Sequence, residues 1–210
     1  MPPLSRSRIV GAAIDLIERE GADAISMRRI AAGLGVGVMS LYNHVPSKAA
    51  LLDAVAETVL SQLAFTDDPG AHWTERVRSQ ARAFRQIAHH YPRSTMVVVS
   101  RQMQSTAGLL PVERALATLR DAGFDAQDAV HVLRTFIAFI VGSLLREVGV
   151  TPAITPAPRA TDVDPVLFPE TGAMAGFFAS YDHEETFEYG LDLLVNAIAV
   201  RLEEHRGARG

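Results

Sequence analysis

Apolar residues recur at intervals of three and four along most of this sequence, and that spacing limits the fold more than any other feature. It is clearest in two sets of residues: Ile9, Ala12, Ala13, Leu16 and Ile17, and then Leu51, Leu52, Val55, Val59 and Leu63. Residues spaced in this way lie on one face of an α-helix. No run of alternating β-branched residues is longer than 97–99, so a sheet is not expected. The sequence therefore predicts an all-α fold.

Serine, glycine and proline mark where the expected helices begin and end. Ser26 and Ser47 suit helix N-caps. Gly21 and Gly35 suit helix ends, and Pro46 stops the helix that precedes it. The helices expected from these signals span about 5–20, 26–34, 38–43, 48–63, 74–90, 94–105, 109–122, 125–147 and 183–205.

Segment 149–170 interrupts this pattern, because it holds five of the eleven prolines in the chain. Proline disrupts a helix interior, so no helix is expected in this segment. Long loops without secondary structure are uncommon in compact domains, and they are often lids or binding loops. A disordered segment is the alternative, and the sequence does not separate the two.

Charge is distributed unevenly over the 210 residues, which carry a net charge of -4. Residues 1–50 hold six basic and four acidic side chains, so their net charge is +2 and that of the remainder is -6. This asymmetry indicates that only the first part of the chain is suited to a polyanion such as DNA.

Several signals bear on the compartment in which the protein works. The sequence has no cysteine, which excludes disulfides and thiolate metal sites. No basic and then apolar leader follows Met1, and the longest apolar run, 136–145, is about half of what a bilayer crossing needs. We therefore expect a cytoplasmic protein that does not enter a membrane.

The expected helices 26–34 and 38–43 are joined by a turn too short for an antiparallel pair. They must cross at a steep angle, as in a helix-turn-helix. This arrangement places one set of residues inside, namely Ala31, Leu34, Val36, Leu41 and Val45. It leaves another set outside, namely Gly37, Val38, Ser40, Asn43 and His44.

The exposed residues of the second helix have the chemistry of a DNA-reading surface. Solvent does not favour exposed Val38 and Met39, whereas a major groove offers thymine methyl groups for apolar contact. The polar residues divide by chemistry: Ser40 and Asn43 suit base edges, and Tyr42, His44 and Lys48 suit phosphate oxygens beside the positive end of the next helix.

Each of these residues also has a structural interpretation. Tyr42 could be a half-buried support with only its hydroxyl in water, and His44 could cap the end of its helix. Arg28 and Arg29 could be a solvated pair, although one of them is expected to contact DNA.

Residues 5–60 resemble the DNA-binding domain of the tetracycline-repressor (TetR) family of transcriptional regulators. The resemblance is carried by Leu-Gly-Val at 34–36, Leu-Tyr-Asn-His-Val at 41–45, and Ser-Lys followed by Ala-Ala-Leu-Leu-Asp-Ala-Val at 47–55. It implies DNA contacts by Arg28, Ser40, Tyr42, Asn43, His44 and Lys48.

Two expected helices have unusually large apolar surfaces. Helix 125–147 is apolar nearly all round in its second half, so it is expected either at the centre of a bundle or at an interface with another subunit, and helix 183–205 offers a second such face. Two such helices from each of two copies would form a four-helix interface. The resemblance implies the same homodimer. Two short reading helices related by a two-fold axis would recognise a palindromic operator in double-stranded DNA.

The rest of the chain contains residues that could line a small-molecule site. Apolar residues alternate there with a few polar groups, among them Arg101 and Gln104, and this mixture is typical of ligand cavities but also of an ordinary helical core. The candidate ligand-binding residues are Gln80, Phe84, Met96, Val99, Met103, Arg134, Phe136 and Phe139.

Residues 70–205 also look similar to the ligand-binding domain of the tetracycline repressors, most clearly at 187–203 (FEYGLDLLVNAIAVRLE). The resemblance places Gln80 and Phe84 at pocket positions. Where those proteins hold a magnesium-tetracycline complex, this chain has Ala64, Val98, Ala138 and Arg146, which supply no ligands for a hard cation. We therefore expect a hydrophobic effector, with no metal and no cofactor.

Together these observations predict a DNA-binding domain at 1–47, a connecting helix at 48–66, and a domain for effector binding and dimerisation at 67–210. The predicted function is that of a repressor released from its operator by the effector. One alternative is a DNA-binding protein without an effector.

A metal-free enzyme is the weaker alternative. The only clusters of site-like residues are 89–91 (His-His-Tyr) and 182–185 (Asp-His-Glu-Glu), and neither has the spacing of a zinc site. The histidines suit the exposed end of a helix, and the acidic cluster suits the start of the last helix.

Overall fold

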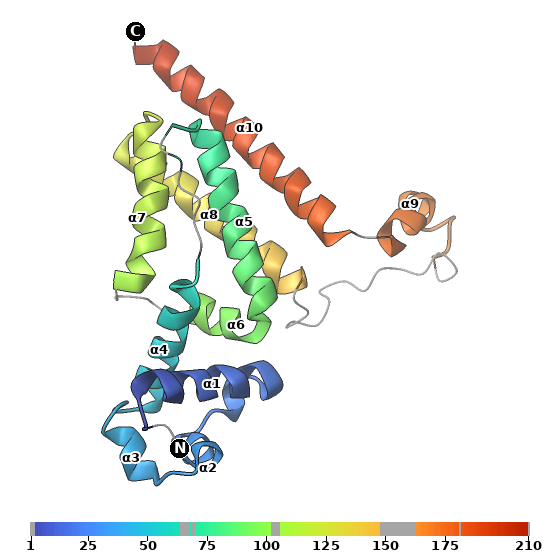
Figure 1. Cartoon of the computed structure of the whole chain (residues 1–210). Helices are drawn as coiled ribbons and strands as arrows, with labels where there is room; N and C mark the ends of the chain where they lie inside the picture. Colours follow the sequence, from blue (N-terminus) through green and yellow to red (C-terminus); the bar gives the residue numbers. More distant parts are fainter. Residues whose placement is uncertain are drawn as a thin grey trace. The chain divides into compact units, whose positions relative to one another are not determined.

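The computed structural model describes residues 3–63, 68, 70–101, 106–147, 163–180 and 182–209, and this part of the chain is helical without a strand (Figure 1). The elements are α1 (Arg6–Glu20), the 3-10 helix η1 (Ala22–Ala24), α2 (Met27–Leu34), α3 (Val38–Tyr42), α4 (Lys48–Leu60), α5 (Trp73–His90), α6 (Pro92–Ser100), α7 (Thr106–Asp121), α8 (Ala126–Glu147), α9 (Pro169–Ala179) and α10 (His183–Arg209). The predicted all-α fold is confirmed.

Local capping explains why the first helices start and stop as the sequence predicts. Ser5, Ser26 and Ser47 each accept a hydrogen bond from the backbone N–H three residues later, at 3.1 to 3.3 Å. Gly35 ends α2 with φ of 68°, a left-handed conformation that favours glycine. The backbone can therefore turn sharply from α2 into α3.

Some helix bounds differ from the predicted ones. The fourth helix ends at Leu60 rather than 63, and the sixth spans Pro92–Ser100 rather than 94–105. Pro92 occupies the first turn of α6, where a missing N–H costs nothing. Residues 102–105, which were expected to close this helix, lie outside the described residues.

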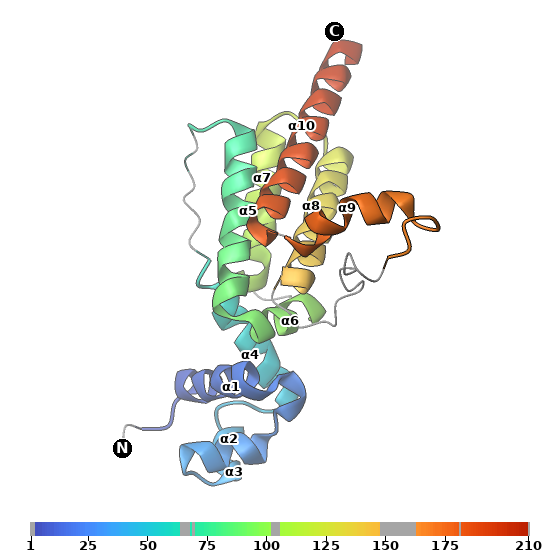
Figure 2. The ribbon, with the colours of Figure 1, turned by 90° about the vertical axis from the view of Figure 1, so that its right-hand side faces the viewer.

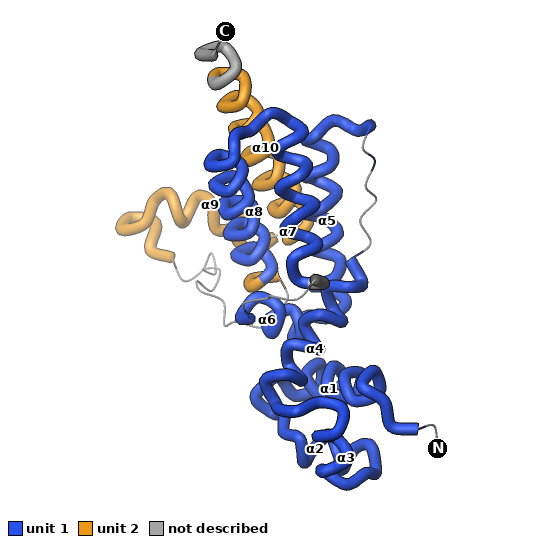
Figure 3. The backbone as a smooth tube through the Cα atoms, turned by 90° about the vertical axis from the view of Figure 1, so that its left-hand side faces the viewer, with its two compact units in different colours: residues 1–144 blue, residues 145–210 orange. Residues whose placement is uncertain are grey.

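Residues 1–144 and 145–210 form two compact units (Figure 3). In the first unit, α1 to α4 surround a small apolar core. Its fully buried side chains include Ile9 and Ile17 of α1, Leu41 of α3, and Leu51, Val55 and Val59 of α4. Burying one such side chain stabilises a fold by roughly 1.5–3 kcal/mol, so this core holds the short α3 in place.

Helices α5, α7 and α8 run side by side in the same unit, and α6 lies across the end of α5 (Figures 1 and 2). Trp73 at the start of α5 packs edge-on against Phe124, which lies just before α8, with ring centroids 5.6 Å apart. By length and composition alone α8 could cross a membrane. It buries Ala129, Val132 and Leu144, and the core helix of a folded unit has this composition too.

The second unit contains α9 and α10. Helix α9 was not predicted, because its apolar residues 173–178 have no helical period and because segment 149–170 was expected to be non-helical throughout. Pro169 is compatible with the helix since it occupies the first turn. Residues 149–162 of that segment lie outside the described residues, so the choice between a lid and disorder stays open as a prediction.

Helix α10 carries apolar residues on two faces. The first face is buried and includes Phe187, Leu191, Val195 and Leu202. The second is exposed and consists of Tyr189 (67% exposed), Leu193 (56%) and Val200 (60%). Residues at intervals of four and seven share one side of a helix, so the exposed set forms a continuous stripe.

Candidate DNA interface and ligand cavity

The surface that the sequence assigns to DNA consists of α3, the turn after it and the start of α4. Met39 is 71% exposed and Tyr42 is 43% exposed. Ser40, Asn43, His44 and Lys48 are also exposed. Leu41 and Val45 are buried as predicted, so they fix the orientation of this surface from below.

Val38 does not have the exposure that the sequence analysis assigned to it. Its side chain is half-buried and packs against the core of the first unit. Val38 precedes Leu41 by three residues and therefore lies on the same side of α3. The prediction that the Val38 side chain is fully exposed is therefore wrong. Met39 presents the larger apolar surface to solvent.

The structure distinguishes the two arginines at the start of α2. Arg29 Nη2 contacts both carboxylate oxygens of Glu20 at 2.8 Å, and Arg29 Nη1 donates to the backbone oxygen of Ala24 at 3.3 Å. Arg28 is exposed and has no such partner in the described part of the chain. Arg29 thus ties α2 to α1, whereas Arg28 is available to a phosphate.

Helix α6 is fixed to the first four helices at both of its ends. At its start, Glu18 of α1 accepts hydrogen bonds from the backbone N–H groups of Arg93, at 3.2 Å, and of Ser94, at 2.7 Å. Arg93 Nη1 also donates to the backbone oxygen of Arg19. A carboxylate is favourable at a helix N-terminus, so this contact positions α6 against α1.

At the end of α6, Arg101 forms the second attachment. Its Nε pairs with Asp53 Oδ1 of α4, and its Nη2 donates to the backbone oxygen of Ala49 at 3.2 Å. Ala49 is the neighbour of Lys48. The end of α6 is therefore held directly against the turn of α4 that carries a candidate DNA contact.

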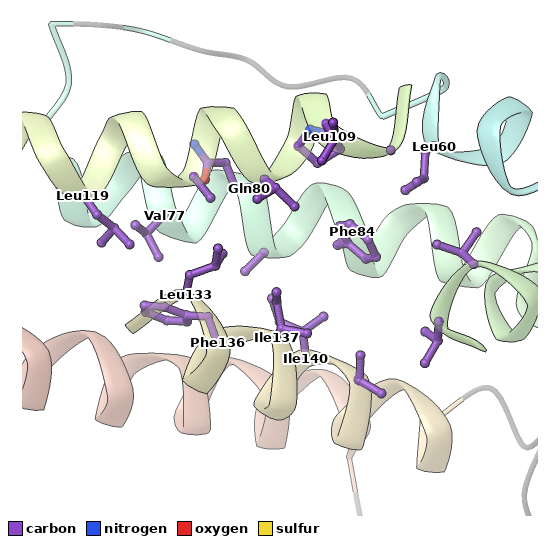
Figure 4. A pocket seen from close by; sticks show the side chains of 18 of the residues that line it. Leu60, Val77, Gln80, Phe84, Leu109, Leu119, Leu133, Phe136, Ile137 and Ile140 are labelled. Atoms are coloured by element: carbon purple, nitrogen blue, oxygen red, sulfur yellow. The ribbon is translucent and has the colours of Figure 1, made fainter. Parts of the chain in front are cut away.

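A cavity of about 350 Å³ lies inside the first unit (Figure 4). It is lined by Leu60, Val77, Gln80, Ala81, Phe84, Val98, Val99, Arg101, Gly108, Leu109, Pro111, Val112, Ala115, Leu119, Leu133, Phe136, Ile137, Ile140 and Val141. Gln80 and Arg101 are the polar side chains of this lining. Such a volume and such a wall are typical of a site for a small, mostly apolar molecule.

The cavity brings together four of the eight candidate ligand-binding residues, namely Gln80, Phe84, Val99 and Phe136. Met96, Arg134 and Phe139 do not line it, and Met103 lies outside the described residues. The reason is helical phase: the lining residues of α8 are 133, 136, 137, 140 and 141, and positions 134 and 139 fall on other sides. The same phase could have found Val77 and Ala81, which flank Gln80 on its face of α5.

Gln80 belongs to a hydrogen-bond chain that joins α5 to α7. Its Nε2 donates to Thr118 Oγ1 at 3.0 Å, and Thr118 Oγ1 donates to the backbone oxygen of Arg114 at 3.0 Å. Thr118 is fully buried. The polar group on the cavity wall is therefore held in one orientation.

Among the described residues, no group of three His, Cys, Asp or Glu side chains could hold a metal ion. Of the four positions compared with a magnesium site, Val98 lines the cavity and Ala64 lies outside the described residues. The acidic cluster begins the last helix, where Asp182 Oδ1 accepts from the N–H groups of Glu184 and Glu185 at 2.8 and 3.0 Å. Its role as a helix start agrees with the prediction.

This fold and these two sites define a helix-turn-helix DNA-binding protein with an internal ligand cavity. Comparison with known families gives the same result. Residues 9–55 match the family described as bacterial regulatory proteins, tetR family, and residues 66–202 match the tetracyclin repressor-like C-terminal domain.

Individual relatives extend over nearly the whole chain. The tetracycline repressor protein class A from transposon 1721 of Escherichia coli is 33% identical over 217 aligned positions, which cover 100% of this chain and 97% of that protein. The crystal structure of apo ActR from Streptomyces coelicolor has a TM-score of 0.84 at 26% identity, covering 98% of this chain and 99% of that one. ActR in complex with actinorhodin has a TM-score of 0.82 at 26% identity, with coverage of 96% and 99%.

The chain therefore belongs to the TetR family of bacterial regulatory proteins. It is a ligand-responsive, DNA-binding transcriptional repressor and not an enzyme. Members of this family bind operator DNA and small-molecule effectors and act as dimers. The predictions of family, fold class and general function are confirmed.

Proposed function

We propose that two copies of this chain bind a palindromic operator, and that a small hydrophobic effector in the α5–α8 cavity releases them from it. The observation that carries this proposal is the position of Arg101. This side chain lines the cavity and at the same time holds Asp53 and Ala49 at the start of α4. A molecule that moves Arg101 would also move the helix that begins with Lys48.

This arrangement suggests a separate role for each of three segments of the chain. Residues 1–47 bind DNA, residues 48–66 connect, and residues 67–210 bind the effector and dimerise in the cytoplasm. Met39 would contact thymine methyl groups, with Val38 assisting only at its exposed edge. Ser40 and Asn43 would contact base edges, and the phosphate contacts would come from Arg28, Tyr42, His44 and Lys48.

The proposed dimer forms through α8 and α10. The exposed stripe of Tyr189, Leu193 and Val200 supports this assignment, because solvent does not favour a continuous row of large apolar side chains. Two such stripes can pack against each other across a two-fold axis. The dimer would set the distance between the two copies of α3 and so match it to successive major grooves.

The contrast between Arg28 and Arg29 gives a paired test of the DNA surface. We expect Arg28→Ala to weaken operator binding and to lower the salt dependence by about one phosphate contact per protomer, while the melting temperature stays the same. Arg29→Ala should lower the stability by no more than about 1 kcal/mol, because its pair with Glu20 is exposed. Binding titrations at several salt concentrations and thermal melts measure both effects. Equal loss of DNA affinity in the two variants would contradict the assignment.

A DNA-selection experiment with the purified protein tests the proposed function as a whole. We expect a palindromic sequence to be enriched, and its affinity to fall with a logarithmic salt slope of about 0.9 per phosphate contacted. The same operator then serves as a probe in a screen for small molecules that release the protein. Enrichment of a non-palindromic sequence would contradict the proposal that a symmetric dimer binds the operator. An operator complex that no cavity-binding molecule weakens would favour the alternative of a DNA-binding protein without an effector.

A further inference from the structure

Sulfur oxidation in this protein acts on methionine alone, because the sequence contains six methionines and no cysteine. Four of the methionines belong to the described residues, and their exposure differs widely. Met27 is buried, Met96 is half-buried, Met174 of α9 is 48% exposed, and Met39 of α3 is 71% exposed. Because an oxidant must reach the thioether, Met39 is the preferred target among these four.

Met39 lies on the proposed DNA-reading surface and outside the core. Helix α3 spans only Val38–Tyr42, and the buried side chains of Leu41 and Val45 fix its orientation. Met39 is not among the side chains that pack against this core, and α3 lies on the outside of the first four helices (Figures 1 and 2). A chemical change at its sulfur therefore alters the reading surface without disturbing the packing beneath it.

Oxidation of a thioether by a peroxide is a balanced two-electron step. The sulfur lone pair attacks one oxygen of hydrogen peroxide, an S–O bond forms as the O–O bond breaks, and water is released. The product is a polar sulfoxide, which methionine sulfoxide reductases convert back to the thioether. In the proposed contact with a thymine methyl group, the sulfoxide oxygen of Met39 would lose its water and gain no hydrogen-bond donor, which is unfavourable.

We propose that Met39 is a reversible oxidation switch on the operator-binding surface: its sulfoxide form releases the operator, and reduction restores binding. The inference rests on the proposed function, because it takes α3 as the helix that contacts bases. It adds a second input besides the effector, and this input changes the reading surface directly. Bound operator should in turn cover the Met39 sulfur, so that the complex is oxidised there more slowly than the free protein.

The first test measures the affinity of the full chain for the selected operator before and after treatment with hydrogen peroxide. Peptide mass spectrometry gives the oxidised fraction at each methionine. Oxidation of Met39 should lower the affinity at least about fivefold for each copy, and so about twenty-fivefold for a dimer. Incubation with reductases for both sulfoxide epimers should restore the affinity. Unchanged affinity with Met39 fully oxidised would overturn the proposal.

Two leucine variants assign the effect to one sulfur atom. Met39→Leu is compared with itself before and after peroxide, and its affinity should not respond to the treatment. Met174→Leu should bind the operator as the unmodified chain does, and it should lose affinity on oxidation to the same extent. A loss of affinity that persists in Met39→Leu would overturn the assignment, and a lowered melting temperature in that sample would place the damage in the core.

Protection by DNA distinguishes this inference from the function on which it rests. The oxidation rate of Met39 is measured with and without saturating operator, and Met174 provides the internal reference. A lower rate at Met39 alone, together with an affinity that oxidation does not change, would support α3 as the contact helix and contradict the switch. Equal rates at Met39 with and without bound operator would contradict the proposed contact between α3 and DNA, and the switch with it.

Discussion

Leu193→Glu is expected to convert the dimer to a monomer and to reduce operator affinity by at least about a hundredfold. Leu193 lies in the middle of the exposed stripe of α10 and is 56% exposed in the single chain. In the proposed dimer, two copies of this residue would be buried near the two-fold axis, where paired carboxylates repel each other and lose their hydration. Because each protomer supplies only one reading helix, loss of the dimer removes half of the operator contacts.

Sedimentation and operator titrations measure the two consequences of this substitution. Leu193→Met is the matched control, since it keeps an apolar side chain of similar volume and should leave both properties unchanged. The exposed position of Leu193 means that the monomer should stay folded, which its helical content would show. A Leu193→Glu protein that is still dimeric would contradict the assignment of this stripe to the interface.

Asp53→Asn is expected to leave effector affinity nearly unchanged while removing most of the effect of the effector on DNA binding. Allosteric coupling of this kind usually amounts to a factor of about 5–150 in affinity. Asp53 does not line the cavity, but it pairs with Arg101, which does. Without this ion pair, Arg101 keeps only its hydrogen bond to the backbone oxygen of Ala49, so a movement of Arg101 pulls much less strongly on the start of α4. The ratio of operator affinities with and without the effector measures the loss.

A second carboxylate on α4 provides the control for this substitution. Glu57 pairs with Arg6 of α1 at 3.5 Å and not with Arg101. Glu57→Gln should therefore retain the full response to the effector, although it removes the same charge from the same helix. If the effector changes the operator affinity of the two variants by the same factor, the coupling between the cavity and the DNA surface does not depend on the pair of Arg101 with Asp53.

Features set by near neighbours in the sequence could be predicted, since they depend on local chemistry. The caps at Ser26 and Ser47 and the glycine turn at Gly35 are of this kind, and they place α3 correctly. Val38 is the exception, since its spacing of three from Leu41 places it partly on the buried side of α3.

Features set by tertiary packing could not be predicted in the same way. The partner of Arg29 is nine residues away, and the partner of Arg101 is forty-eight residues away. Neither pairing has a local signal. Three of the predicted ligand residues, Met96, Arg134 and Phe139, do not line the cavity, because residue type alone does not give the phase of each helix toward its neighbours. Helix α9 was missed because its apolar residues surround the helix instead of forming a stripe.

The two attachments of α6 also restrict how its length can change. Glu18 holds the start of this helix, and Asp53 holds the residue that follows its end. One residue inserted at the end of α6, after the buried Val97 and Val98, would lengthen the helix by about 1.5 Å and rotate Arg101 by about 100° about the helix axis. Arg101 would then face away from α4 while the rest of the fold could remain intact. Insertions and deletions in this helix should therefore produce proteins that bind their operator and ignore their effector.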